Sequence, residues 1–105
     1  MEQFGITDKS YNLIINTLKS FPEIEKSLIF GSRAKGTARK GSDIDLALVG
    51  EKIDYKIISK ISYILNEDLP IPYRIDLIDY NSLKNNGLKA EIDQFAKIFL
   101  QKNET

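Results

Sequence analysis

The chain has 105 residues, 42% of them hydrophobic, which suffices for one domain with a hydrophobic core. Its 15 lysine and arginine residues balance its 15 aspartate and glutamate residues, and this neutrality argues against a protein that holds long DNA or RNA by the backbone. Cysteine and histidine are both absent, which excludes disulfide bonds, thiol catalysis, Cys/His zinc sites and a Ser-His-Asp triad.

The first half of the chain predicts one helix followed by two buried strands. The helix is expected from a cap at residue 7 or 8 to Phe21, because apolar residues recur at helical spacing until Pro22 interrupts them. Ser27–Phe30 is a short apolar run of the kind a buried strand supplies. Ile44–Val49 is apolar apart from Asp45, as in a central strand that is covered on both faces.

The second half predicts another helix, a third strand and a less certain C-terminal segment. Helical spacing of apolar residues indicates a helix from about Asp54 to Asp68, and two prolines separate it from a strand over Tyr73–Asp79. Asn81–Asn86 predicts one helical turn with Gly87 as its stop. Helical spacing then resumes at Leu88, Ile92, Phe95 and Phe99, although residues 97–100 would also serve as a short strand. Residues 1–105 are therefore expected to form a single α/β domain.

A phosphate-binding turn is predicted where the first strand ends. Gly31 lets the backbone approach a ligand closely, and a helix that begins at Ser32 would aim free N–H groups at it. All charged residues between Ser32 and Ser42 are cationic, namely Arg33, Lys35, Arg39 and Lys40. Such a loop in a neutral protein suits a polyphosphate, although Arg33 and Lys35 could equally be solvated without touching one.

Three aspartates predict a metal site beside this turn. Asp43 and Asp45 are two positions apart, so on a strand they would share a face, about 6.6 Å apart along the chain. A divalent cation would offset their repulsion and their desolvation. Asp76 lies in another apolar run and would join them if the two strands were neighbours. Three carboxylates suit two-metal phosphoryl chemistry, with Asp43 and Asp45 as ligands and Asp76 as a ligand or as the base for an acceptor hydroxyl.

These motifs resemble those of a known family. Gly-Ser-x-Ala-x-Gly at residues 31–36, Ser-Asp-x-Asp-Leu at 42–46 and the later apolar-flanked Asp76 resemble the signature of polymerase-beta-like nucleotidyltransferases. The nearest branch is that of the minimal nucleotidyltransferases, which are often encoded beside a helical HEPN-domain partner. The resemblance implies a small mixed β-sheet flanked by helices. One departure from the family pattern is Phe95-Ala96, where relatives tend to have Glu-Gly, and it leaves the end of the last helix open.

The resemblance also implies a function and a set of site residues. Some relatives are antitoxins that adenylylate a partner toxin, so we expect transfer of AMP from ATP to a HEPN-type partner in a toxin–antitoxin system. Two Mg²⁺ ions are the expected cofactors, with Mn²⁺ as an alternative. The implied catalytic and metal-binding residues are Asp43, Asp45 and Asp76. The resemblance implies that Gly31 and Ser32 bind the triphosphate, and Arg33, Lys35 and Ser42 of the same loop are further candidates for nucleotide binding.

Other interpretations weigh less. Residues 31–37 mimic a Walker A loop, but Thr37 stands where that motif needs lysine, and Ala47 and Leu48 exclude an EF-hand loop. An Asp-x-Asp glycosyltransferase stays open, although the chain is short for that fold. A second hypothesis is an antitoxin that neutralises a helical partner by binding alone, for which three converging carboxylates would be unnecessary. We expect a cytoplasmic protein, because no signal-peptide pattern and no apolar run of ~20 residues occurs.

Four residues outside these motifs carry narrower expectations. Asp79 should cap a turn, since it falls on the strand face opposite Asp76. Arg74 alternates onto the face of Asp76, where it would form an ion pair or bind substrate. Phe95 and Phe99 are expected in the core. Tyr63 lies on the polar side of its helix, and its exposure would indicate a partner surface.

Overall fold

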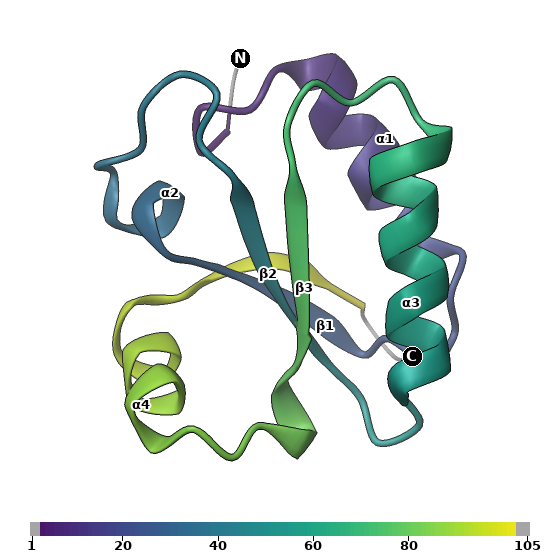
Figure 1. Ribbon diagram of the computed structural model, residues 1–105, viewed down its shortest axis with the longest axis vertical. Helices are drawn as coiled ribbons and strands as arrows, with labels where there is room; N and C mark the ends of the chain where they lie inside the picture. The colour runs from purple at the N-terminus through teal and green to yellow at the C-terminus, as the bar shows by residue number, and fades with distance from the viewer. Residues whose placement is uncertain (1–2, 103–105) are drawn as a thin grey trace.

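The computed structural model describes residues 3–102, in which a four-stranded mixed sheet has helices on both faces (Figure 1). The strand order is β3-β2-β1-β4. Strand β1 (Lys26–Phe30) pairs antiparallel with β2 (Ile44–Val49) and with β4 (Lys97–Gln101), whereas β2 pairs parallel with β3 (Ile75–Asp79). The predicted mixed sheet flanked by helices is therefore confirmed.

The helices begin at capping residues that the sequence supplies. Helix α1 (Asp8–Lys19) begins after Thr7, whose side chain accepts a hydrogen bond from the amide of Ser10, and α3 (Tyr55–Tyr63) begins after Asp54, which caps it in the same way. A π-helical turn (Ile64–Asp68) continues α3. In Figure 1 the helices α1 and α3 lie to the right of the sheet, and α2 (Ser32–Lys35) and α4 (Asn86–Phe95) lie to its left.

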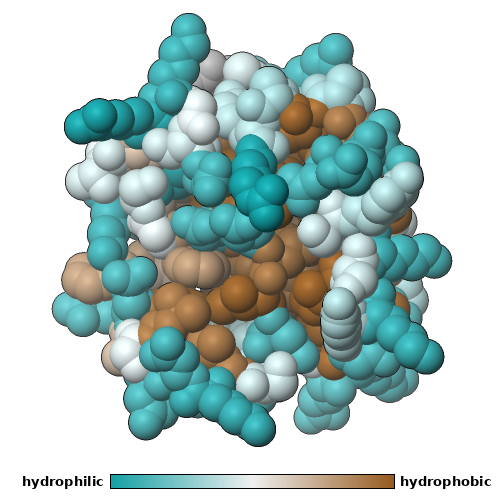
Figure 2. Space-filling view, in the orientation of Figure 1, coloured by the Kyte–Doolittle hydropathy of each residue, from teal (hydrophilic) through white to brown (hydrophobic). Residues whose placement is uncertain are grey.

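The two faces of the sheet bury very different amounts of apolar side chain. The face toward α1 and α3 carries the large core, whose fully buried members include Ile14, Leu18, Ile29, Leu46, Leu48, Ile61 and Leu65. The face toward α4 carries a cluster of only three buried residues, Phe30, Ala47 and Ile92. In the space-filling view of Figure 2, apolar surface gathers low in the centre, between α4 and α3, and hydrophilic surface lies above it. The sheet is thus covered fully on one face and partly on the other.

The C-terminal segment corrects two predictions and settles a third. Gly87 does not stop a helical turn but lies in the first turn of α4, because the side chain of Asn85 accepts a hydrogen bond from the amide of Leu88 at 3.0 Å and caps the helix there. Phe99 is buried in the large core as expected, but Phe95 is 42% exposed, so its prediction as a core residue was wrong. Residues 97–101 form β4 rather than a helix.

Two further expectations concern single residues and membranes. Asp79 caps a short 3₁₀ turn (Tyr80–Ser82) by accepting a hydrogen bond from the amide of Asn81, which confirms its predicted role. Tyr63 is 60% exposed and lines a groove of about 710 Å³ between α3 and the edge of β3. Within residues 3–102, every helix is too short or too polar to cross a membrane.

Candidate active site

The pairing of β2 with β3 brings two predicted site residues together. In the parallel register Asp45 lies opposite Asp76, and the amide of Ile44 donates to the carbonyl of Arg74 at 2.9 Å. Ile44 and Ile75 point into the large core, so the alternation of side chains turns both aspartates to the other face, the one that α4 covers only in part. The condition set for Asp76 to join the other aspartates, that its strand is a neighbour of the Asp45 strand, is therefore met.

Negative charge is concentrated at Asp45. Its pKa is raised to about 6, first by burial and then by the charges of Asp76 and Asp43, with further contributions from a hydrogen bond to Asp76 and from the charge of Glu91 on α4. A carboxyl group in this setting resists ionisation unless a positive charge joins it. Every cause of the shift, among the residues that the structure describes, therefore disfavours the charged form of Asp45.

A hard divalent cation fits this donor set, because carboxylate oxygens are the ligands that Mg²⁺ prefers. The three carboxylates are not equivalent, however. Asp43 lies exposed in the loop before β2, whereas Asp45 and Asp76 lie partly buried on neighbouring strands. Across residues 3–102, no three acidic side chains form a ready-made group that could hold a metal ion. Metal ligation by Asp43, Asp45 and Asp76 thus remains a proposal.

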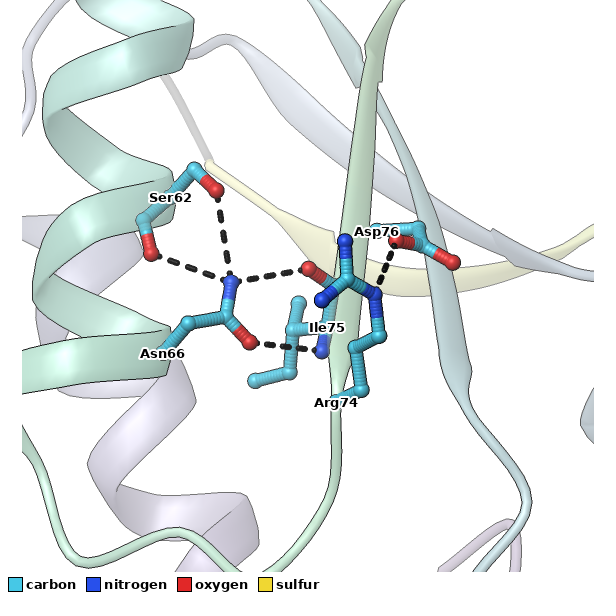
Figure 3. A network of polar contacts seen from close by, with 5 residues as sticks. All are labelled: Ser62, Asn66, Arg74, Ile75 and Asp76. Carbon is cyan, nitrogen blue, oxygen red and sulfur yellow. Dashed lines mark hydrogen bonds and ion pairs between the residues drawn. The ribbon is translucent and has the colours of Figure 1, made fainter.

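Arg74 is the cation that contacts Asp76. Its Nε donates to Oδ1 of Asp76 at 3.2 Å, which is the ion pair that strand alternation predicted (Figure 3). The Arg74 side chain is 72% exposed, so the pair stabilises the fold little. The alternative expectation, that Arg74 binds substrate, stays a prediction, since an exposed guanidinium can also turn toward an anion.

Gly31 places the predicted phosphate turn directly against Asp45. The backbone of Gly31 has φ 74° and ψ −153°, and a Cβ atom at this position would lie 2.5 Å from Oδ2 of Asp45. Any other residue would therefore meet both backbone strain and a steric clash. Helix α2 begins at the next residue, Ser32, as predicted. The turn and the carboxylate pair consequently form one continuous surface.

Arg33 holds the loop that follows this turn. Its side chain is 5% exposed, and its guanidinium donates to the carbonyls of Ser42, at 2.6 Å, and Phe4, at 2.9 Å, and lies 4.9 Å from the ring centre of Tyr73. The hydroxyl of Ser42 accepts a hydrogen bond from the amide of Arg39 and closes the loop. The two residues were predicted to bind nucleotide, and the structure shows both engaged in the loop that leads to Asp43.

Lys35 connects the two helices on the open face. Its Nζ lies 3.1 Å from Oε1 of Glu91 and 4.8 Å from the ring centre of Phe95, both on α4. Glu91 also contributes to the raised pKa of Asp45. Sequence reasoning missed Glu91, because it lies 56 residues from Lys35 in a helix with no motif, and no local pattern signals such a contact.

Comparisons with known proteins identify the family of the chain and its fold. The family model described as polymerase beta nucleotidyltransferase matches residues 12–105. Over 76 residues, 71% of the chain, the sequence is 40% identical to a Haemophilus influenzae protein named probable protein adenylyltransferase MntA, and the match spans 64% of that relative's length.

Two solved structures show the same fold. A crystal structure of a toxin–antitoxin with AMP-PNP matches with a TM-score of 0.71 and 26% identity, over 88% of this chain and 73% of that chain. A complex of a tri-AMPylated Shewanella oneidensis HEPN toxin with an MNT antitoxin matches with a TM-score of 0.66, over 90% of this chain and 71% of that chain, and its 22% identity supports the fold alone. Because the family model covers well over half of the chain, the protein belongs to the polymerase beta nucleotidyltransferase family.

Proposed function

We propose that this protein is a magnesium-dependent nucleotidyltransferase that moves AMP from ATP to a hydroxyl group of a HEPN-type partner protein, and that it works as an antitoxin in the cytoplasm. The observation that carries the proposal is the pairing of Asp45 with Asp76 directly against Gly31. This arrangement puts two carboxylates and a close-approach backbone turn on one open face of the sheet, which is what transfer between a triphosphate and an acceptor requires.

The proposed reaction is an in-line displacement at the α-phosphorus of ATP. The acceptor oxygen forms a bond to that phosphorus, the bond to the oxygen bridging the α- and β-phosphorus atoms breaks, and pyrophosphate leaves. Gly31 and Ser32 would lie against the triphosphate, and Lys35 would leave Glu91 to contact it. Asp76 would accept the proton of the acceptor hydroxyl, or share the metal with Asp45.

A divalent metal would be held by Asp45 and Asp76, with Asp43 completing the site from the adjacent loop. When bound, Mg²⁺ polarises phosphate oxygens and neutralises the charge of the leaving pyrophosphate. The raised pKa of Asp45 supports this assignment, because a bound cation would offset both the burial and the neighbouring negative charges that raise it. Mn²⁺, which also takes oxygen ligands, should substitute.

Relatives support ATP as the donor and a toxin as the acceptor. The Haemophilus influenzae relative is named a probable protein adenylyltransferase, one solved neighbour contains AMP-PNP, and another pairs an MNT antitoxin with an AMPylated HEPN toxin. We extend these roles to this chain because its carboxylates and turn residues occupy one site. The exposed Tyr63 beside the β3 groove offers surface on which a partner could dock.

The test uses ATP labelled on the α-phosphate. The wild type or the double variant Asp43→Asn, Asp45→Asn would be incubated with Mg²⁺ and a host lysate that lacks this gene. We expect a labelled protein band with the wild type only, and its size would identify the acceptor. ATP labelled on the γ-phosphate should give no band that depends on the added wild type, since that label leaves in pyrophosphate, and this result separates nucleotidyl from phosphoryl transfer.

Asp54→Asn is a matched control for the loss of a carboxylate. Asp54→Asn removes one carboxylate far from the site while Asn still caps α3, so this variant should label the acceptor like the wild type. If none of the four nucleoside triphosphates labels any protein, the transferase proposal fails. Capture of the partner by both the wild type and the double variant would then favour an antitoxin that acts by binding alone.

A further inference from the structure

The side-chain amide of Asn66 pairs with both backbone groups of Ile75. Its Oδ1 accepts a hydrogen bond from the amide of Ile75 at 2.9 Å, and its Nδ2 donates to the carbonyl of Ile75, also at 2.9 Å (Figure 3). The same Nδ2 donates to the carbonyl of Ser62 at 3.0 Å and lies 3.3 Å from the Ser62 hydroxyl. The amide therefore connects the end of α3 with the first residue of β3.

The side chain of Asn66 supplies hydrogen-bond partners for backbone groups of β3 that the sheet leaves unpaired. Within residues 3–102, strand β3 lies at the edge of the sheet with β2 as its single strand neighbour, so the backbone groups of Ile75 that point away from β2 need another partner. The Ile75 side chain is buried, and unpaired backbone groups next to the core are costly. Asn66 supplies one donor and one acceptor in the place of a further strand.

The backbone around Asn66 forms an uncommon π-helical turn at this contact with β3. Residues 64–68 form a π-helical turn, in which the amide of Leu69 donates to the carbonyl of Ile64 at 3.1 Å. A π turn is wider than an α turn and is found frequently at functional sites. Here the wide turn lies where the helix meets the edge of β3, and Asn66 is its central residue.

Ile75 is the residue directly before Asp76. The contacts on the two sides of β3 at Ile75 therefore set the position of the Asp76 backbone, from which its side chain extends. On one side, the pairing with β2 sets Asp76 opposite Asp45, and on the other side Asn66 holds Ile75. We propose that Asn66 is a positioning residue, which keeps β3 in the register and distance from β2 that bring the Asp76 carboxylate to Asp45. This proposal rests on the metal site of the proposed function, because the position of Asp76 matters only if the carboxylate pair binds metal.

The test compares Asn66→Ala with Asn81→Ala. Asn81 is a matched control, because its Oδ1 also accepts a hydrogen bond from a backbone amide, that of Gly50 at 3.2 Å, but at the far end of the sheet. Asn66→Asp is a second variant that keeps the acceptor and loses the donor. Transfer of labelled AMP to the acceptor and the Mg²⁺ concentration for half-maximal thermal stabilisation would be measured for each, below its melting temperature.

We expect Asn66→Ala and Asn66→Asp to lower kcat by roughly 10- to 100-fold, as loss of a residue that orients a metal ligand does, with the KM for ATP changed by less than about threefold. The Mg²⁺ midpoint should rise in both variants. Asn81→Ala should lower the melting temperature and leave kcat and the Mg²⁺ midpoint unchanged. A lower melting temperature alone in the Asn66 variants would overturn the proposal, since it would show a purely structural role.

The two proposals fail in different ways. If the wild type transfers no nucleotide, the proposed function fails, and the Mg²⁺ midpoint alone decides the role of Asn66. A midpoint raised in both Asn66 variants but not in Asn81→Ala would still support positioning of Asp76. A midpoint unchanged by the Asn66 variants, or a wild type that Mg²⁺ does not stabilise, would overturn it.

Discussion

Asp45 lies opposite Asp76 across the parallel pairing of β2 and β3, and a Cβ atom added at Gly31 would lie 2.5 Å from Oδ2 of Asp45, so the carboxylate would have to shift. Three features therefore meet at Asp45: the register of β2 with β3, the close approach of Gly31, and an environment that disfavours the charged carboxylate. The strain is visible in the pKa of Asp45, which burial and the neighbouring carboxylates raise to about 6. Each part of the arrangement makes a separate prediction.

Stability should depend on the ionisation of Asp45. In the absence of metal, the folded state retains a proton on Asp45 until about pH 6, whereas the unfolded chain releases it near pH 4. Folding therefore takes up a proton in this window, so the contribution of Asp45 to stability is fully present below about pH 4 and is lost as pH rises through about 6. In chelator, the melting temperature of the wild type minus that of Asp45→Asn should fall over this range. A difference that stays constant with pH would contradict the raised pKa.

Asp45→Asn should separate strain from metal binding. Above about pH 7 in chelator, this variant should melt at or above the wild-type temperature, because it removes a charge that burial and repulsion disfavour. In Mg²⁺ it should lose most of the stabilisation that the wild type gains. Thermal melts with and without Mg²⁺ give both results, with Asp54→Asn as the control for charge. Full Mg²⁺ stabilisation of Asp45→Asn would remove this residue from the metal site.

Gly31→Ala should destabilise more than Gly36→Ala. Gly36 has φ 76° and ψ 17°, the left-handed helical region, where a side chain costs roughly 1–2 kcal/mol. Gly31 has φ 74° and ψ −153°, a region essentially restricted to glycine, where the backbone strain is roughly 1–3 kcal/mol. Only at Gly31 does the new Cβ also meet Oδ2 of Asp45, whereas the space at Gly36 is open. Urea denaturation measures both, and the excess at Gly31 should shrink in an Asp45→Ala background. Equal losses at the two glycines would contradict the close contact.

Arg33→Lys should lower the free energy of unfolding by about 2–4 kcal/mol, because one ammonium group cannot replace the guanidinium contacts to Ser42 and Phe4 and the packing on Tyr73. Arg39→Lys, at an exposed position of the same loop, should change it by less than about 0.5 kcal/mol. Chemical denaturation monitored by tyrosine fluorescence tests both. A small loss for Arg33→Lys would mean that the loop does not depend on this residue.

Glu91→Gln should strengthen ATP binding with little effect on stability. The Lys35–Glu91 pair is more than a third exposed on both sides, so its loss should change the free energy of unfolding by less than about 1 kcal/mol. Without Glu91, Lys35 is free to contact the triphosphate, and one negative charge near Asp45 is removed. Calorimetric titration with ATP and Mg²⁺ checks the affinity, with Glu51→Gln as a charge-matched control. Weaker binding by Glu91→Gln would indicate that Glu91 itself holds the ligand.

Much of the site could be predicted because its signals are local. Gly31-Ser32 follows one apolar run, Asp43 and Asp45 enter a second, and Asp76 lies in a third, so strand periodicity alone placed these residues at the ends of strands. The parallel register of β2 and β3 then put Asp76 beside Asp45. The residues next to each of these positions in the sequence are therefore enough to predict where it lies on its strand.

Residues whose roles depend on distant contacts could not be predicted in this way. Asn66 is a polar residue of a helix, and only its distance to the edge of β3 gives it a function. Arg33 resembled a phosphate ligand because it stands in a cationic loop, but its guanidinium turns inward to backbone carbonyls. Phe95 is an aromatic residue at helical spacing, as core residues are, yet it lies at the surface with Lys35 over its ring.

The thin packing of α4 has a consequence for how the protein moves. Ile92 is the buried residue of α4, whereas Ser10, Ile14, Ile15 and Leu18 are buried in α1. Less buried apolar surface means a lower free energy of local opening, so the amide hydrogens of α4 should exchange with solvent well before those of α1. The face that carries the candidate site therefore borders a helix that should open more readily than α1, on the opposite face of the sheet.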